Sequence, residues 1–402
     1  MAVSEPTTLP PADRMARPGL DRLAAALGAD AGGARYVGGA VRDTLLGIPV
    51  ADIDVATIHP PREVVRRLQA AGIKAVPTGI AHGTITAVAD GTVVEVTTLR
   101  RDVTTDGRHA EVAFTDDWQA DAARRDFTMN ALYADMRSHQ LHDYFGGTAD
   151  LRAGRVRFIG DPLRRIAEDH LRILRFFRFL ARFGDAPDAE GLAACIARAN
   201  DLMALSRERI ADELLKLLVA RDAVGVLRLM VGNAIWQPVL PELDSAAVNR
   251  LGTLVAAEGA AGMAPDPIRR LAALLDPDNA EGVTARLKLS NAQRKRVALA
   301  LGEATESPLA LGYRLGVEGA VDRLLLAGDP AAAALVADWT RPTLPLSGGA
   351  LVERGLARGP DVARALRQVE DRWIAEGFPA ANRTAEIADM VVAQALRASS
   401  NA

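Results

Sequence analysis

"GGAVRDTLLGIPVADIDVAT", residues 38–57, is the stretch that decides how this chain folds. The apolar residues before it predict a strand over residues 34–37, and Gly38 and Gly39 then predict a tight turn into a short helix. Two residues without side chains let a phosphate approach backbone N–H groups at a helix start, and Arg42 lies in the first turn. By itself, such a turn is more often plain structure than a phosphate site.

Asp52 and Asp54 lie near the end of the same stretch. On a strand, residues i and i+2 project from one face, so the two carboxylates are expected to be neighbours. Like charges this close are unfavourable unless a cation separates them, and Mg²⁺ is usually held by one or two carboxylates with substrate phosphates. Glu95, inside the apolar strand "TVVEVTTL", is the candidate for a third carboxylate that positions or activates an attacking hydroxyl. A solvated strand edge is the alternative for both features.

The composition indicates a globular chain with room for two or three domains, because 49% of its 402 residues are hydrophobic. A formal net charge of −3 gives no general attraction to nucleic acid, so RNA binding would need a local basic face. The single cysteine, Cys195, favours a reducing compartment, and we expect the cytoplasm. No apolar run is long enough to span a membrane, and residues 1–30 are expected to be a flexible leader rather than a signal peptide.

The sequence pattern changes once along the chain. Its first part alternates short apolar strands with helices, and Asp90-Gly91 predicts a two-residue hairpin. After about residue 160, Leu and Ala recur at helical spacing, including a helix over "IAEDHLRILRFFRFLARFG". We therefore expect an α+β fold, in which a head with a small mixed sheet is followed only by helices. The expected strands lie at residues 34–39, 52–57, 74–79, 83–89 and 93–99, and the expected head helices at 40–47 and 61–72.

Two later segments combine arginines with acidic residues. "RRDFTMNAL", residues 124–132, contains Arg125, and arginine suits triphosphate oxygens. In "EDHLRILRFFRF", residues 168–179, an Asp can accept from an exocyclic amine and an Arg can donate to a ring nitrogen or carbonyl, so one pair can read a base edge. A helix-to-strand connection and a solvated helix with ion pairs are the alternatives. The charged side chains of the second segment recur every three residues, at Asp169, Arg172, Arg175 and Arg178.

Together and in this order, these segments resemble the class II nucleotidyltransferases, which include bacterial CCA-adding tRNA nucleotidyltransferases and bacterial poly(A) polymerases. The similar stretches, from residue 35 to about residue 220, are "VGGAVRD", "DID", "TTDGRHAEV", "RRDFTMNAL", "DYFGG" followed by "DL", "EDHLRILRFFRF" and "RERIADELLKLL". The resemblance implies a head, neck, body and tail. We expect the catalytic head at residues 31–150, a neck with a base-recognition helix at 151–220, and an RNA-binding body and tail at 221–402.

The resemblance implies a role for each of these polar residues. Asp52 and Asp54 would bind Mg²⁺, with Glu95 as the third catalytic carboxylate. The nucleotide's triphosphate would be bound by Gly38, Gly39, Arg42 and Arg125. Its base would pair with Asp169 and Arg172, in a pocket also lined by Arg175 and Arg178. "TTDGRHAEV" would be the flexible loop associated with switching from C to A addition, with Asp106 and Arg108 as its polar members.

The activity implied by the resemblance is template-independent addition of C, C and A to the tRNA 3′ end, from CTP and ATP with release of pyrophosphate. A poly(A) polymerase, a CC-only or A-only enzyme, and a non-catalytic RNA-binding protein are the alternatives. Some relatives append a phosphohydrolase domain that needs several histidines, but all six histidines here lie between His59 and His170, so we expect no such activity. Two arginine-rich segments, residues 151–185 and 286–296, are expected to flank the path of the tRNA acceptor arm, with a solvated helix face as the alternative for the second.

Overall fold

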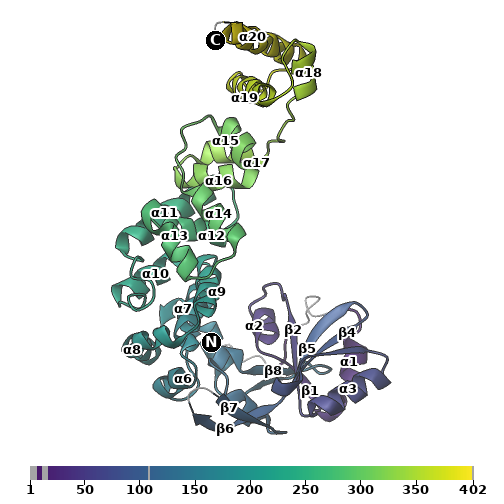
Figure 1. Cartoon of the computed structure of the whole chain (residues 1–402). Helices are drawn as coiled ribbons and strands as arrows, with labels where there is room; N and C mark the ends of the chain where they lie inside the picture. Colours follow the sequence, from purple (N-terminus) through teal and green to yellow (C-terminus); the bar gives the residue numbers. More distant parts are fainter. Residues whose placement is uncertain (1–6, 11–16, 107–108, 401–402) are drawn as a thin grey trace. The chain divides into compact units, whose positions relative to one another are not determined.

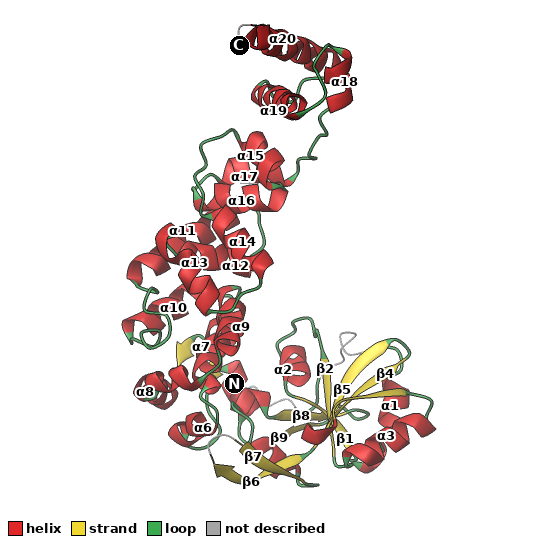
Figure 2. Ribbon diagram, viewed as in Figure 1, coloured by secondary structure: helices red, strands yellow, loops and turns green. Residues whose placement is uncertain are grey.

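The computed structural model describes residues 7–10, 17–106 and 109–400, which divide into two compact units, Met1–Pro241 and Glu242–Ala402 (Figure 1). The strands of the described residues lie in the first unit, and the second unit is helical (Figure 2). The predicted α+β fold, with a mixed sheet followed by helices, is confirmed. Within the described residues, no helix is long and apolar enough to cross a membrane.

The head is built on a seven-stranded sheet with the order β3-β4-β5-β2-β1-β8-β9. Only β2 and β5 pair in parallel within it, and the other neighbours are antiparallel. The five strands predicted from the sequence form its β1 to β5, and β8 and β9 complete it. The strands are β1 Ala34–Val37, β2 Ile53–Thr57, β3 Lys74–Gly79, β4 Thr84–Ala89, β5 Thr92–Thr98, β8 Leu132–Asp135 and β9 Leu141–Asp143.

The predicted hairpin between β4 and β5 forms at Asp90 and Gly91. Both residues have positive φ, +49° and +84°, as a type I′ turn requires. α1 and α3 contact β3 or β4, whereas α2 contacts β1, β2 and β8. The helices of the first unit are α1 Leu20–Ala26, α2 Gly39–Leu45, α3 Pro61–Ala70, α4 Trp118–Ala123, α5 Gly147–Arg152, α6 Pro162–Glu168, α7 Leu171–Phe183, α8 Ala189–Ala197, α9 Arg207–Leu218 and α10 Ala223–Gly232.

Two segments differ from their description in the sequence. Residues 20–26 of the expected leader form α1, because Leu20 and Leu23 are buried against the head. The described residues of the expected flexible loop, 104–106 and 109–112, lie on two antiparallel strands, β6 Arg100–Asp106 and β7 His109–Phe114. Asp106 ends β6 and Arg108 lies outside the described residues, so the role expected of these two residues stays a prediction.

The single helix predicted over "IAEDHLRILRFFRFLARFG" is wrong, because the chain breaks between α6 and α7. Asp169 has an extended backbone, with φ −152° and ψ 107°, and its carboxylate accepts a hydrogen bond from the backbone N–H of Leu171. An aspartate that caps the next helix favours this break over helix continuation. Asp169 therefore precedes α7, while Arg172, Arg175 and Arg178 lie on it.

Four aromatic rings pack where α7 meets the head. Phe127, which follows α4, lies 4.8 Å from Phe158 and 5.4 Å from Phe179 between ring centroids. Phe158 and Phe176 stack at 5.6 Å with nearly parallel planes. Because the head supplies one of these rings and α7 supplies two, their burial fixes α7 beside the sheet.

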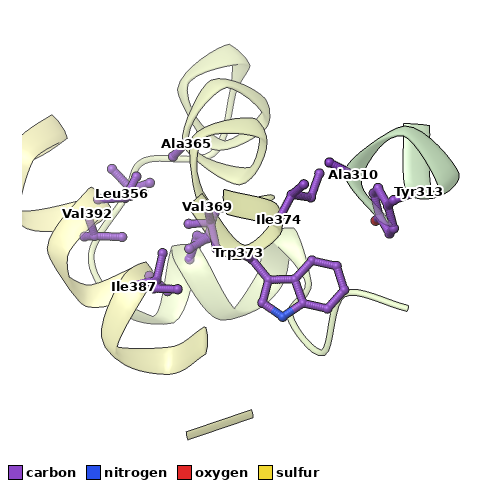
Figure 3. Packing of buried hydrophobic residues seen from close by; sticks show 12 residues of the cluster. Ala310, Tyr313, Leu356, Ala365, Val369, Trp373, Ile374, Ile387 and Val392 are labelled. Atoms are coloured by element: carbon purple, nitrogen blue, oxygen red, sulfur yellow. The ribbon is translucent and has the colours of Figure 1, made fainter. Parts of the chain in front are cut away.

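The second unit contains ten helices within its described residues. Figure 3 shows part of its core, where Trp373 and Ile374 of α19 pack near Tyr313 of α15 and Ile387 of α20. The Tyr313 and Trp373 rings meet edge to face at 5.5 Å. The helices are α11 Ser245–Ala260, α12 Pro267–Leu274, α13 Pro277–Arg286, α14 Asn291–Ala300, α15 Pro308–Leu315, α16 Val317–Leu326, α17 Pro330–Ala337, α18 Gly348–Glu353, α19 Pro360–Ala375 and α20 Ala381–Ser400.

Arg296, within the second arginine-rich segment, is held by carboxylates. It forms ion pairs with Asp266 at 2.9 Å, Glu318 at 2.9 Å and Asp322 at 2.7 Å. Its charge is therefore neutralised within the second unit, which gives Arg296 a structural role. Lys295 beside it is exposed.

We predict that Phe176→Ala will lower the free energy of unfolding of the first unit by about 3–5 kcal/mol, because it removes a fully buried ring and leaves a cavity. Phe176→Leu, which fills most of that space, should cost clearly less. Urea unfolding followed by circular dichroism measures both values. A loss below about 1 kcal/mol for the alanine variant would show that the aromatic cluster does not hold α7.

Candidate active site

Strands β2 and β5 bring three carboxylates together. Asp54 pairs directly with Glu95 in the parallel register, and the buried Ile53 pairs with the buried Val94. Because side chains alternate along a strand, Asp54 and Glu95 share the face opposite to these two apolar residues. Asp52, Asp54 and Glu95 line one pocket of about 1020 Å³, called here the carboxylate pocket. The structure thus unites the three carboxylates that the sequence singled out.

The electrostatics around Asp54 favour a nearby cation, although the same pocket is also lined by Arg17, Arg175, Arg178 and Lys216. Burial raises the pKa of Asp54 above its ordinary value, and the negative charges of Glu95 and Asp52 raise it further, while Arg125 opposes them. The described residues contain no group of three or more His, Cys, Asp or Glu side chains arranged to hold a metal ion. Asp52 and Asp54 are two carboxylates that line the same pocket, and such a pair fits a divalent cation that takes its other ligands from water and phosphates.

A second pocket, of about 370 Å³, begins at the glycines that follow β1. Gly38 has a φ of +65°, and a Cβ atom there would lie 3.4 Å from Arg125 Nη1, so glycine keeps this turn open beside the guanidinium. α2 has only seven residues, and the arginines supply most of the positive charge. This glycine pocket is lined by Gly38, Gly39, Arg42, Asp54, Arg124, Arg125, Asp126, Asn130, Asp169, Arg172, Arg175 and Phe179.

Arg42 is a buried cation at the floor of the glycine pocket. Its guanidinium donates to Asp43 at 2.8 Å and to Asn130 Oδ1 at 2.6 Å, and it lies over the rings of Phe179 and Phe183. Burial lowers the pKa of Arg42, because it disfavours the charged form, and the nearby cations lower it further, although Asp43 opposes them. An anion in the pocket would stabilise this charge, as expected for a phosphate site.

Asp121 of α4 positions two arginines of the same pocket. Its buried carboxylate forms ion pairs with Arg124 at 2.8 Å and with Arg125 at 3.1 Å, and it accepts from the Tyr133 hydroxyl at 2.7 Å. Burial alone would raise the pKa of Asp121, but the charges of Arg125 and Arg124 and the hydrogen bond from Tyr133 outweigh it and lower the pKa to about 2. Asp121 is thus ionised at neutral pH and fixes Arg125 beside Gly38.

Asp126 and Arg175 join the head to α7. The Arg175 guanidinium lies 2.6 Å from Asp126 Oδ2, and Asp126 Oδ1 accepts from Asn130 Nδ2 at 3.0 Å. Asn130 in turn accepts from Arg42, so one chain of hydrogen bonds runs from α7 to the glycine turn. The pocket wall is therefore one connected polar network.

The residues expected to read the base lie in two pockets. Asp169 and Arg172 line the glycine pocket, where Asp169 pairs with Arg209 at 3.0 Å and Arg172 pairs with Glu168 at 2.7 Å. Arg178 instead lines the carboxylate pocket and pairs with the buried Glu213 of α9 at 2.6 Å. The ion pair between Arg209 and Asp169 is partly exposed, at 49% and 37% of the two side chains, and is therefore weak.

The two pockets are adjacent, because both are lined by Asp54, Arg175 and Phe179. A nucleoside triphosphate in the glycine pocket would place its phosphates among arginines and near the carboxylate pair. Such an arrangement can position a phosphorus atom beside a carboxylate-bound cation. The fold and the site together define a nucleotidyltransferase head joined to a helical region.

Sequence reasoning missed several residues of this site. Asp121 could have been found, because it lies three and four residues before Arg124 and Arg125, which is the spacing of an ion pair on a helix. Phe179 carried no such signal, since its ring in an apolar helix is typical of a core. Glu213 carried no clear signal either, because it follows Asp212 in "RERIADELLKLL" and both acids look like a solvated helix face.

Comparison with known proteins agrees with this class. Residues 34–157 match the family "Poly A polymerase head domain", and residues 187–247 match "Probable RNA and SrmB- binding site of polymerase A". The chain is 35% identical over 369 residues to mouse mitochondrial CCA tRNA nucleotidyltransferase 1, covering 86% of this chain and 83% of that protein. It is 38% identical over 231 residues to the CCA-adding enzyme of Levilactobacillus brevis, covering 57% of this chain and 56% of that enzyme.

Among solved structures, the CCA-adding enzyme of Bacillus stearothermophilus in complex with CTP is similar to this chain, with a TM-score of 0.76 and 26% identity. The similarity covers 96% of this chain and 100% of that one. The chain belongs to the CCA tRNA nucleotidyltransferase family, whose members generally depend on a divalent metal.

We predict that Asp121→Asn will destabilise the protein in a pH-dependent way. A carboxyl whose pKa falls from 3.8 to about 2 on folding contributes about 2 kcal/mol above pH 4, and this contribution is lost as the pH falls from 4 to 2. The difference in unfolding free energy between wild type and variant should therefore be constant near neutrality and shrink below pH 4. Urea unfolding at pH 7, 4 and 3 measures it.

Asp116→Asn, at an exposed position just before α4, is the matched control and should show almost no difference at any pH. The KM for the nucleoside triphosphate should also rise in Asp121→Asn, because Arg125 loses its ionic partner. A pH-independent difference would contradict the ionised state assigned to Asp121.

Proposed function

We propose that this enzyme adds C, C and A to the 3′ end of tRNA, using CTP and ATP and releasing pyrophosphate. The observation that carries the proposal is that one pocket combines glycines and arginines suited to a triphosphate with Asp169 and Arg172, while sharing Asp54 with the carboxylate pocket. The identity of 35% to the mouse CCA tRNA nucleotidyltransferase over most of both chains supports the same activity.

In this proposal the glycine pocket binds the incoming nucleotide. Gly38 and Gly39 leave room for the phosphates, and Arg42 and Arg125 neutralise them. Asp169 and Arg172 then hydrogen-bond the base edge, in place of a nucleic-acid template, with Arg175 in the same pocket. Each such contact discriminates against a wrong base by roughly 1–3 kcal/mol.

Chain extension takes place at the carboxylate pocket. Mg²⁺ is the metal we propose for Asp52 and Asp54, where it would neutralise charge on the phosphates and lower the pKa of the attacking hydroxyl. Glu95 is proposed to accept the proton of the RNA 3′ hydroxyl. The 3′ oxygen then forms a bond to the α-phosphorus. The bond between the α-phosphorus and the oxygen that bridges the α- and β-phosphates breaks, and pyrophosphate leaves.

A poly(A) polymerase is the second candidate, because the matching head family carries that description. The two activities differ in product length. We expect wild-type protein to add CCA to a tRNA that lacks the three terminal nucleotides, to add one A to a tRNA that ends in CC, and then to stop. Electrophoresis of labelled RNA with CTP, ATP or both measures this. Long A tracts, or equal use of an unrelated RNA, would favour the polymerase.

We predict that Asp54→Asn will reduce nucleotide incorporation by two or more orders of magnitude. Without metal, the melting temperature of the variant should not fall, because the change removes a charge that Glu95 and Asp52 repel. Mg²⁺ should raise the melting temperature of wild type more than that of the variant. Asp90→Asn, at the hairpin of the same sheet and outside both pockets, is the control and should keep full activity. Normal turnover in Asp54→Asn would contradict the metal assignment.

The cytoplasm is the proposed location, on the basis of the single cysteine. The mouse relative is named as a mitochondrial protein, and cell fractionation distinguishes the two compartments.

A further inference from the structure

Arg17 comes from the part of the chain that the sequence predicts to be a flexible leader, yet it lines the carboxylate pocket. Its guanidinium Nη2 donates one hydrogen bond to the backbone carbonyl of Val50 at 2.6 Å and another to that of Ala51 at 3.1 Å. These two residues directly precede Asp52, the first of the paired aspartates. Arg17 is thus connected to residues 33 and 34 positions further along the chain, where it approaches β2.

The loop that leads to Asp52 has little else to hold its backbone. Among the described residues, no backbone–backbone hydrogen bond involves Val50 or Ala51. The side chain of Val50 is buried, and a backbone carbonyl beside buried atoms is unfavourable without a donor. Arg17 supplies that donor, and a hydrogen bond from a charged group is stronger than one from a neutral group. The conformation of the chain as it reaches Asp52 therefore depends on Arg17.

The backbone that carries Arg17 is fixed to the sheet. Gly19 has a φ of +81°, and a Cβ atom there would lie 2.5 Å from the backbone oxygen of Ala89 at the end of β4, so the chain turns directly against this strand. Leu20 and Leu23 of α1 follow and are buried. Because Arg17 is two residues before Gly19, its side chain extends from an anchored backbone and can hold the loop in place.

Arg17 holds the backbone beside Asp52 and leaves the carboxylate of Asp52 free. Within the described part of the chain, Arg17 forms no ion pair, so its charge does not occupy carboxylate oxygens. A positive charge in the pocket opposes a divalent cation, but Asp52 is exposed and solvent screens this repulsion. Contacts that orient a metal ligand, in comparison, typically change metal affinity about 10–100-fold. We therefore expect the orienting effect of Arg17 to exceed its repulsion of the metal.

We propose that Arg17 is a positioning residue, which sets the backbone before Asp52 and so places the Asp52 carboxylate beside Asp54 for a divalent cation. Residues 17–19 are then part of the catalytic head. This proposal rests on the metal that the proposed function assigns to the two aspartates. Loss of Arg17 lowers the metal affinity and kcat, but it leaves the KM for CTP unchanged, because Arg17 does not line the glycine pocket.

The first test measures the binding of Mn²⁺, a paramagnetic substitute for Mg²⁺, to the full-length protein without nucleotide or RNA. The EPR signal of free Mn²⁺ gives the Kd. We expect the Kd to rise about tenfold in Arg17→Met, which keeps an unbranched side chain but has no donor. In Arg17→Lys it should rise less than threefold, because the ammonium can still donate to a carbonyl. In an Asp52→Asn background, Arg17→Met should cause no further change, because Arg17 acts through Asp52.

Arg22→Met is the matched control. Arg22 follows Arg17 in the same segment and pairs with Asp90 at the β4–β5 hairpin, outside both pockets. The control should keep the Kd for Mn²⁺ within twofold of wild type and retain full kcat. Tighter Mn²⁺ binding in Arg17→Met would show that charge repulsion is the larger effect and would overturn the proposal. An unchanged Kd in Arg17→Met, or an equal rise in both variants, would overturn it as well.

The position of the loop is measured without metal, by a nitroxide label attached at Ala51→Cys. The side chain of Ala51 is exposed, whereas the natural Cys195 is buried and out of reach of the reagent. We expect the EPR spectrum of the label to show higher mobility in Arg17→Met, but not in Arg17→Lys or Arg22→Met. Equal mobility in all of these proteins would contradict the proposal. If wild type binds no Mn²⁺, the metal assignment of the proposed function fails, and the label spectra alone decide whether Arg17 fixes the loop before Asp52.

Discussion

The ion pair between Asp126 and Arg175 holds the active site together, because it joins the head to α7 across their junction. Two other arginines bridge the same junction, with Arg165 donating to the backbone carbonyl of Arg125 at 2.8 Å and Arg172 to that of Arg124 at 3.2 Å. Asp126 is buried and Arg175 is about a third exposed, so removal of Arg175 would leave a buried carboxylate without its cation. These contacts hold α7 against the head, so the residues that each supplies to the glycine pocket keep their relative positions.

Because the head and α7 are held together in this way, charged groups of the same sign can lie close to one another in the site. Asp54 lies beside Glu95 on the neighbouring strand, and Arg42 is buried near other cations, although Asp43 pairs with it. A divalent cation would reduce the repulsion between the carboxylates. Phosphate groups would reduce the repulsion between the arginines.

Much of the fold follows from local sequence. The glycine turn, the five strands of β1 to β5 and the type I′ hairpin at Asp90-Gly91 were predicted because their signals depend on neighbouring residues. The break at Asp169 was not, since Leu and Phe at helical spacing conceal the capping aspartate between two helices. β8 and β9 were also not predicted, because strands this short contain too few residues to show the alternation of apolar and polar side chains.

The sequence by itself determined which chemistry was present: paired aspartates, a glycine corner and a charged helix, in an order that resembles a known family. Only the tertiary structure decided which of these groups meet. The parallel register of β2 and β5 put Glu95 opposite Asp54, and the packing of α7 on the head put Asp169 and Arg172 in the glycine pocket but Arg178 beside the carboxylates. Residue spacing fixes which side chains share one face of an element, whereas packing between elements distant in sequence fixes which faces adjoin.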